Sequence, residues 1–127
     1  MAIRTELSLR LPNSPGALAK VCTALVSARV NLVALHLEGS GRLRMIVDNP
    51  LSGAGALREH DYQVEERDVL YAVVPNTPGA LAGTARLIAD GGVNIDYAYA
   101  TALEGGGMSA IVFGVADAQR AATAAGL

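Results

Sequence analysis

Two loops in this sequence combine an asparagine with a Pro-Gly pair, and these groups could together hold a small zwitterion. Asn13-Ser14-Pro15-Gly16-Ala17-Leu18 returns 63 residues later as Asn76-Thr77-Pro78-Gly79-Ala80-Leu81. An asparagine side chain carries both a donor and an acceptor, so it can meet either charge of an amino acid. The first N–H groups of a helix, here expected from Gly16, Ala17 and Leu18, attract a carboxylate, and a glycine lets a ligand approach the backbone.

A second asparagine recurs at the same spacing, because Val30-Asn31-Leu32 corresponds to Val93-Asn94-Ile95. Both kinds of asparagine also have a structural explanation. Asparagine is a good turn residue before Ser-Pro or Thr-Pro, and it can end a helix in a left-handed conformation. The recurrence of both positions favours a shared binding role, and the structural alternative stays open.

The other reactive side chains form no pattern that is typical of catalysis. Cys22 lies on a predicted apolar helix face and is expected to be a small core residue. His36 and His60 fall in different predicted elements, without the acidic neighbours of a catalytic triad or the spacing of a metal site. The run Gly105-Gly106-Gly107 is followed by Met108 and lacks the Lys-Ser/Thr of a phosphate-binding loop. We therefore expect no enzymatic activity, no metal and no cofactor.

The pattern of apolar residues predicts the elements that position the two loops. Alternating polar and apolar side chains indicate strands, and apolar residues three and four apart indicate helices, with Ser14 as an N-cap and Pro15 as the first helical residue. In the first half the predicted elements are a strand at 6–11, a helix from 15, strands at 31–38 and 42–48, a helix at 50–60 and a strand at 62–66. In the second half they are a strand at 69–74, a helix at 78–90, strands at 94–103 and 108–115, and a helix from 117.

The element order βαββαβ is that of a ferredoxin-like α+β fold, and it occurs twice. We predict two modules side by side, at 1–67 and 68–127, with the second module lacking its last strand. A two-residue insertion in the later glycine loop would align Met45-Ile46-Val47 with Ala110-Ile111-Val112. The missing strand would expose the sheet edge beside 69–74, so we expect this edge to be covered by 62–66 or by another chain, and the protein to form at least a homodimer.

The N-x-P-G-x-L loop after a first strand, with V-N-[IL] opening the second strand, resembles the ACT domain. The resemblance extends over nearly the whole chain, twice, and the layout is similar to that of small free-standing bacterial proteins made of two ACT domains. It implies a regulatory protein that binds a small amino acid at an interface between modules and thereby shifts conformation or assembly. A non-binding regulatory or structural subunit that docks onto a metabolic enzyme is the alternative.

The resemblance also implies which residues bind the ligand, since the loop asparagine and the asparagine of the second strand contact it in amino-acid-binding ACT domains. We expect Asn13 to work with Asn94, and Asn76 with Asn31. Leu11 and Val74 replace the histidine of serine-binding members, so a serine site is not favoured. The predicted ligand-binding residues are Asn13, Ser14, Gly16, Ala17, Leu18 and Asn31, and Asn76, Thr77, Gly79, Ala80, Leu81 and Asn94.

Composition excludes several other classes of partner. Ten Lys and Arg against twelve Asp and Glu give a net charge of −2, which is not the basic surface of a nucleic-acid-binding protein. Prolines interrupt the longest uncharged run, so no membrane span is expected. Arg4 and Glu6 stand where a secretion signal would be apolar, and the single cysteine suits a reducing compartment. We expect a cytoplasmic protein.

Overall fold

The computed structural model describes residues 1–126 as an α+β fold with six strands and four helices over that range. In chain order the elements are β1 (Ala2–Arg10), α1 (Ala17–Ser27), β2 (Leu32–Leu37), β3 (Arg42–Val47), α2 (Pro50–Glu59), β4 (Glu65–Pro75), α3 (Ala80–Asp90), β5 (Ile95–Ala102), β6 (Met108–Val115) and α4 (Ala118–Ala124). The strand order is β2-β3-β1-β4-β6-β5, and the pairs β1–β3, β2–β3, β4–β6 and β5–β6 are antiparallel. The predicted fold class, a duplicated ferredoxin-like arrangement, is confirmed.

The chain forms two compact units, which we call module 1 and module 2. Module 1 comprises Thr5–Arg67, and module 2 comprises Met1–Arg4 together with the segment from Asp68 onward. The long strands β1 and β4 therefore each contribute one end to each module.

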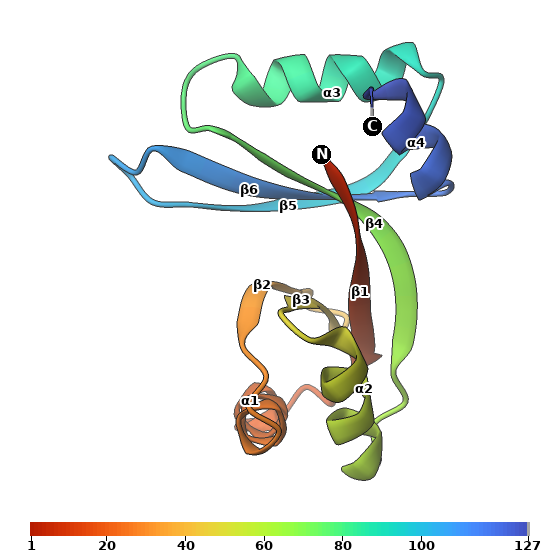
Figure 1. Ribbon diagram of the computed structural model, residues 1–127. Helices are drawn as coiled ribbons and strands as arrows, with labels where there is room; N and C mark the ends of the chain where they lie inside the picture. Colours follow the sequence, from red (N-terminus) through yellow and green to blue (C-terminus); the bar gives the residue numbers. More distant parts are fainter. Residues whose placement is uncertain (127) are drawn as a thin grey trace. The chain divides into compact units, whose positions relative to one another are not determined.

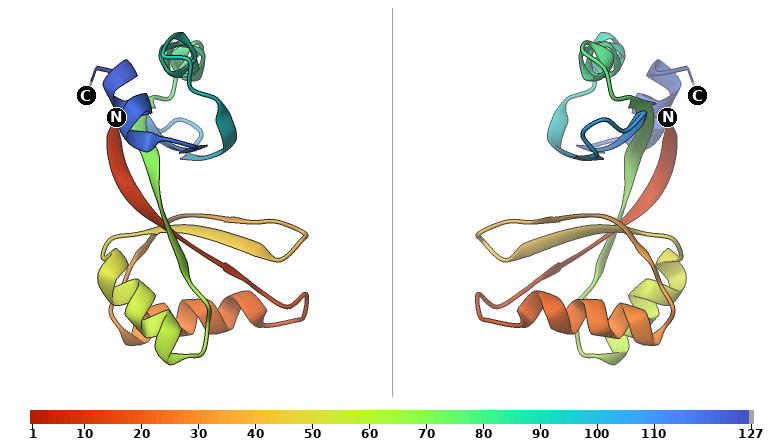
Figure 2. Two further views of the ribbon diagram at one scale, coloured as in Figure 1. Left: turned by 90° about the vertical axis from the view of Figure 1, so that its right-hand side faces the viewer. Right: turned by 90° about the vertical axis from the view of Figure 1, so that its left-hand side faces the viewer.

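Module 1 packs two helices on one face of its strands, as both views in Figure 2 show for α1 and α2. Alternate residues of β1 and β3 point into this core, because successive side chains of a strand face opposite sides. The helices add an apolar stripe, with Val21 and Leu25 from α1 and Leu57 from α2 fully or almost fully buried. The strand residues of this core are Leu7, Leu9, Leu43, Met45 and Val47.

Module 2 builds its own core in the same way, with α3 and α4 on one face of β4, β5 and β6 (Figure 1). Phe113 and Leu70 are its largest fully buried side chains, and Ile88 is the buried residue of α3 that meets them in this core. Ala118, Ala121 and Ala122 of α4 complete it. Small alanine side chains let this short helix lie close to the sheet.

The sheet edge of module 2 that we expected to be open is occupied by the chain's own first residues. β4 lies between β1 and β6, and Met1–Arg4 belong to module 2. Met1 and Ile3 pack against the module 2 core, and the Arg4 guanidinium lies 4.8 Å from the centre of the Tyr71 ring. The prediction that 62–66 or a second chain covers this edge is therefore wrong. Apolar burial and the cation–π contact hold the amino-terminal end of β1 there instead.

The two strands predicted around the junction form one strand. β4 runs without interruption from Glu65 to Pro75, while residues 62–64 have no regular structure. The charged run Glu65-Glu66-Arg67-Asp68, which lies at the predicted boundary between the two modules, is thus the first part of β4. Similarly, β1 begins at Ala2 and not at Glu6. In β4 the exposed side chains of Glu65, Glu66 and Asp68 obscured the strand, because they break the alternation of polar and apolar residues.

Both helices that follow the Pro-Gly pairs begin later than predicted. Gly16 and Gly79, and not Ser14, are the N-cap residues, with φ of 83° and 89° and no side-chain cap hydrogen bond. Such positive φ values favour glycine, because a Cβ atom would crowd the backbone. The glycines are therefore required for the left-handed turn that starts each helix.

The insertion between the repeats is longer than the sequence alignment indicated. Leu7 pairs with Met45, and the residue 63 positions after Leu7, Leu70, pairs with Phe113. Met45 thus corresponds to Phe113 and not to Ala110, which makes the later hairpin five residues longer instead of two. Strand register is fixed by which side chains face the core, whereas a hairpin tip can change length freely.

Candidate functional site

The Asn13 loop and the β2–β3 hairpin lie at the same end of module 1 (Figure 2). Leu11, at the end of β1, is buried, and its N–H donates to the Gly41 carbonyl at 2.7 Å. Ser14 N–H then donates to Pro12 O at 2.9 Å, so the loop turns sharply before Gly16. These contacts place the loop against the hairpin tip.

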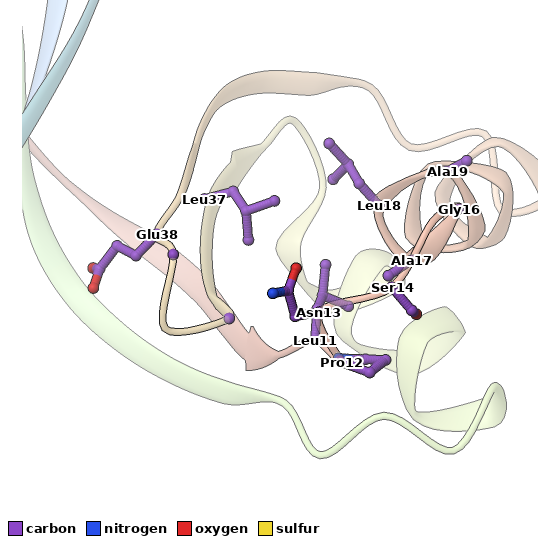
Figure 3. A pocket seen from close by; sticks show the side chains of 12 residues that line it. Leu11, Pro12, Asn13, Ser14, Gly16, Ala17, Leu18, Ala19, Leu37 and Glu38 are labelled. Atoms are coloured by element: carbon purple, nitrogen blue, oxygen red, sulfur yellow. The ribbon is translucent and has the colours of Figure 1, made fainter.

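Between these two segments lies an open pocket of about 450 Å³ (Figure 3). One wall comes from the loop and the first turn of α1, and the other comes from the hairpin. The lining residues are Leu11, Pro12, Asn13, Ser14, Gly16, Ala17, Leu18, Ala19, Leu37, Glu38, Gly39 and Gly41. Five of the six predicted ligand-binding residues of the first repeat therefore lie around one cavity.

The Asn13 amide points into this pocket between the loop and Leu37 (Figure 3). Its side chain has no hydrogen-bond partner within residues 1–126. The helix start adds unused donors. The Ala17 N–H donates to Ser14 O at 3.3 Å, but the N–H groups of Gly16, Leu18 and Ala19 have no acceptor in the described part of the chain. The pocket thus carries one free amide and three free backbone donors at the positive end of a helix.

The hairpin wall presents apolar side chains and backbone to the pocket. The Glu38 carboxylate extends away from Asn13 (Figure 3) and accepts from Arg44 Nε at 3.4 Å. Arg44 also pairs with Glu6 at 3.6 Å, and Glu6 is 1% exposed. The Glu38 carboxylate therefore lies on the side of the hairpin away from Asn13, where the charge of Arg44 partly balances its own.

Asn31 is not among the residues that line the pocket. Its N–H donates to Asp48 Oδ1 at 2.9 Å, and the Asp48 N–H donates to the Asn31 carbonyl at 3.0 Å. These bonds join the start of β2 to the end of β3. In module 1 the backbone of Asn31 therefore has a structural role, while its predicted contact with a ligand stays a prediction.

The corresponding loop of module 2 has a different set of contacts. Asn76 Nδ2 donates to the Leu103 carbonyl at 3.1 Å, and the Asn76 N–H donates to the Gly107 carbonyl at 3.1 Å. Asn94 Nδ2 donates to Asp96 Oδ1 at 3.3 Å. Thr77, Gly79 and Leu81 are exposed, and Ala80 is half-buried at the start of α3.

Sequence reasoning missed the hairpin wall of the pocket. It predicted strands at 31–38 and 42–48, but it did not identify the segment between them as part of a site. The available signal was Gly41, which has φ of 95° and whose Cβ, if present, would lie 2.4 Å from the Leu11 carbonyl oxygen. A glycine at such a close approach marks the point where the hairpin meets the loop.

The remaining candidate groups stand apart from this site. Cys22 is half-buried, and His60 Nδ1 lies 2.8 Å from the Ala56 carbonyl in the last turn of α2. In the described range no three His, Cys, Asp or Glu side chains gather in a way that could hold a metal ion. None of the helices in that range is long and apolar enough to cross a membrane.

Comparisons with known proteins agree with this architecture. The crystal structure of a protein from Bacteroides thetaiotaomicron matches with a TM-score of 0.87 at 30% identity, over 96% of this chain and 85% of that one. The ligand-free regulatory subunit of aspartate kinase from Thermus thermophilus matches with a TM-score of 0.70 at 20% identity, over 98% and 92%. The aspartate kinase regulatory subunit from Thermus flavus gives 0.66 at 18%, over 98% and 93%. At these lower identities the likeness shows the fold alone.

No match was found among curated protein sequences. The family comparison is decisive, because a model described as an ACT domain pair matches residues 1–125, almost the whole chain. The chain belongs to the ACT domain pair family.

Proposed function

We propose that this chain is a regulatory protein that binds a small amino acid in the pocket of module 1 and catalyses no reaction. The observation that carries the proposal is the Asn13 amide, which has no hydrogen-bond partner within residues 1–126. It points into a pocket of about 450 Å³, beside N–H groups of α1 that have no acceptor in that range. Free donors and an acceptor around one cavity suit a ligand that carries both charges.

Each part of an amino acid has a complementary group in this pocket. Its carboxylate would accept from the N–H groups of Leu18 and Ala19, where the helix dipole adds a favourable field. The Asn13 side chain would donate through Nδ2 to the same carboxylate and accept through Oδ1 from the ammonium group. The ligand's own side chain would lie against Leu11, Leu18 and Leu37, which favours a small or apolar amino acid.

Binding at this place would be communicated through the loop and the hairpin. A ligand that contacts both walls stabilises their present separation, which the Leu11–Gly41 hydrogen bond already defines. It would thereby favour the conformations that keep this geometry and shift an equilibrium between states of the protein or of its assemblies. We propose a homodimer in the cytoplasm as the setting for this regulation.

A second candidate is a regulatory or structural subunit that binds no ligand and docks onto a metabolic enzyme. It is favoured by the fold, since regulatory subunits of aspartate kinase share it over 98% of this chain. The two candidates differ in whether amino acids stabilise the isolated protein.

A thermal-shift screen of the common amino acids at millimolar concentration tests the proposal. A ligand that binds only the folded state at 100 times its Kd adds about 2.7 kcal/mol to the free energy of unfolding. We expect one or a few amino acids to raise the melting temperature of the wild type, and Asn13→Ala to remove that rise without lowering the melting temperature of the ligand-free protein. If no amino acid changes the wild-type melting temperature, the binding proposal fails and the enzyme-subunit candidate is favoured.

A further inference from the structure

The asparagines of the two N-x-P-G loops differ in the contacts of their side chains. In module 1 the Asn13 amide is without a partner in residues 1–126 and faces the pocket. In module 2 the Asn76 amide donates to the Leu103 carbonyl at 3.1 Å. The backbone differs as well, since the Asn76 N–H donates to the Gly107 carbonyl, whereas the Asn13 N–H has no acceptor in the same range. The two equivalent asparagines thus differ, because Asn76 makes hydrogen bonds to its hairpin where Asn13 makes none within residues 1–126.

The β5–β6 hairpin, which is five residues longer than its counterpart in module 1, supplies both acceptors of Asn76. In module 1 the last pair of the β2–β3 ladder is Leu37 and Leu43. In module 2 the equivalent pair is Ala100 and Ile111, and the ladder continues through two further pairs to Ala102 and Ser109. We call residues 101–110 the extended hairpin.

The first strand of module 2 follows this extension. β4 continues its pairing with β6 as far as Pro75 and Met108, so the chain arrives at Asn76 directly beside the extended hairpin. The loop and the hairpin tip lie at the same end of module 2 (Figure 1). Leu103 is 78% exposed, so its side chain adds little burial, and the contact with Asn76 is made through its backbone carbonyl.

We propose that the Leu103 carbonyl occupies the Asn76 side-chain donor in place of a ligand. The loop of module 2 then binds no amino acid, and each chain binds one amino acid through module 1. This inference rests on the proposed function. It assigns Asn13 to ligand recognition and Asn76 to positioning the extended hairpin, which departs from the expectation that both loops bind alike.

Competition between the hairpin and a free ligand favours the hairpin. An acceptor on the same chain, joined by a short segment, has an effective concentration in the millimolar range. A free amino acid that binds with millimolar affinity would have to displace both the Leu103 and the Gly107 contacts of Asn76. In module 1 the ligand would displace no protein group from Asn13, which has no such contact within residues 1–126.

The side-chain amide signals of the two asparagines in nitrogen-15-labelled full-length protein test this assignment. Without ligand, we expect the Asn76 amide protons to exchange with water roughly fivefold to tenfold more slowly than those of Asn13, as a single net hydrogen bond would cause. On addition of an equimolar mixture of the common amino acids, we expect the Asn13 signal to shift and the Asn76 signal to stay in place. Asn13→Ala and Asn76→Ala assign the two signals.

A shortened variant provides the matched control. Deletion of residues 103–107 gives the extended hairpin the length of its counterpart in module 1, and we expect Asn76 exchange to rise to the Asn13 rate. Equal exchange rates in the wild type, or an Asn76 shift as large as that of Asn13, would overturn the inference. These two results come from the wild type and do not depend on folding of the deletion variant. A slowly exchanging Asn76 with no shift of either signal would refute amino-acid binding while supporting the Leu103 contact.

Discussion

Substitution of Gly41 tests whether the pocket depends on the contact between the loop and the hairpin. Gly41 has φ of 95°, and a Cβ placed there would lie 2.4 Å from the Leu11 carbonyl oxygen, which is part of the backbone. The left-handed conformation costs a residue with a Cβ about 1–2 kcal/mol. Relief of the clash must also move the hairpin away from the loop and weaken the hydrogen bond of 2.7 Å between Leu11 and Gly41, at a further cost of about 1 kcal/mol.

We therefore expect Gly41→Ala to lower the free energy of unfolding by about 2–3 kcal/mol. Urea denaturation followed by circular dichroism measures this change. Gly39→Ala is the matched control in the same turn, because Gly39 has no positive φ and a Cβ there would meet no atom within 4 Å. The control should stay within about 0.5 kcal/mol of the wild type.

Gly41→Ala also tests whether the position of the hairpin affects ligand binding. If the hairpin moves, the Leu11 amide loses its acceptor, so its hydrogen exchange should accelerate in Gly41→Ala and not in Gly39→Ala. An amino acid that stabilises the wild type should stabilise Gly41→Ala less, because one pocket wall is displaced. A Gly41→Ala protein that is as stable as Gly39→Ala would refute the structural role that we assign to this glycine.

Further substitutions test the remaining structural interpretations. Asn49→Ala should lower the free energy of unfolding by about 1 kcal/mol, since Asn49 Oδ1 accepts from the Ser52 N–H at 3.1 Å. Ser14→Ala should have almost no effect on it, because Gly16 and not Ser14 is the N-cap of α1. Urea denaturation of the two variants tests this difference. Gly83→Ala should raise the free energy of unfolding by roughly 0.5–1 kcal/mol, because Gly83 lies within α3 and a Cβ there would meet no atom within 4 Å. A lower urea midpoint than that of the wild type would contradict this. Gly114→Ala should lower the urea midpoint at a cost of about 1–3 kcal/mol, since its Cβ would overlap the Tyr97 ring, and an unchanged midpoint would show that the ring moves freely.

Local sequence signals predicted the elements that depend on neighbouring residues. The helix after Asn49-Pro50 begins at Pro50 with Asn49 as a side-chain cap, and β6 spans Met108–Val115 as expected. Such features follow from interactions within a few residues, which a sequence shows directly. The helix after Asn13 was placed too early for the same reason, because Ser14-Pro15 is a common start signal, while the left-handed conformation of Gly16 depends on the path of the whole loop.

Features that depend on contacts between residues far apart in the chain could not be predicted from local sequence signals. Nothing near Met1 and Ile3 indicates that they pack in module 2, because their partners lie more than sixty positions along the chain. The length of the inserted segment was underestimated because glycine-rich tips resemble one another, and only the pairing of Leu70 with Phe113 defines the register.

Three features could be predicted from the amino-acid sequence alone: the chain is a duplication, each copy carries an asparagine loop before a helix, and both copies have one fold class. Repetition of residue types at a constant spacing is enough for these conclusions. The folded chain was needed to show that β1 closes the edge of module 2, that the Asn13 loop borders a pocket, and that the Asn76 side chain is hydrogen-bonded to its own hairpin. The physical reason is that edge pairing and hairpin closure join residues far apart in the chain, and their outcome depends on register and length and not on local composition.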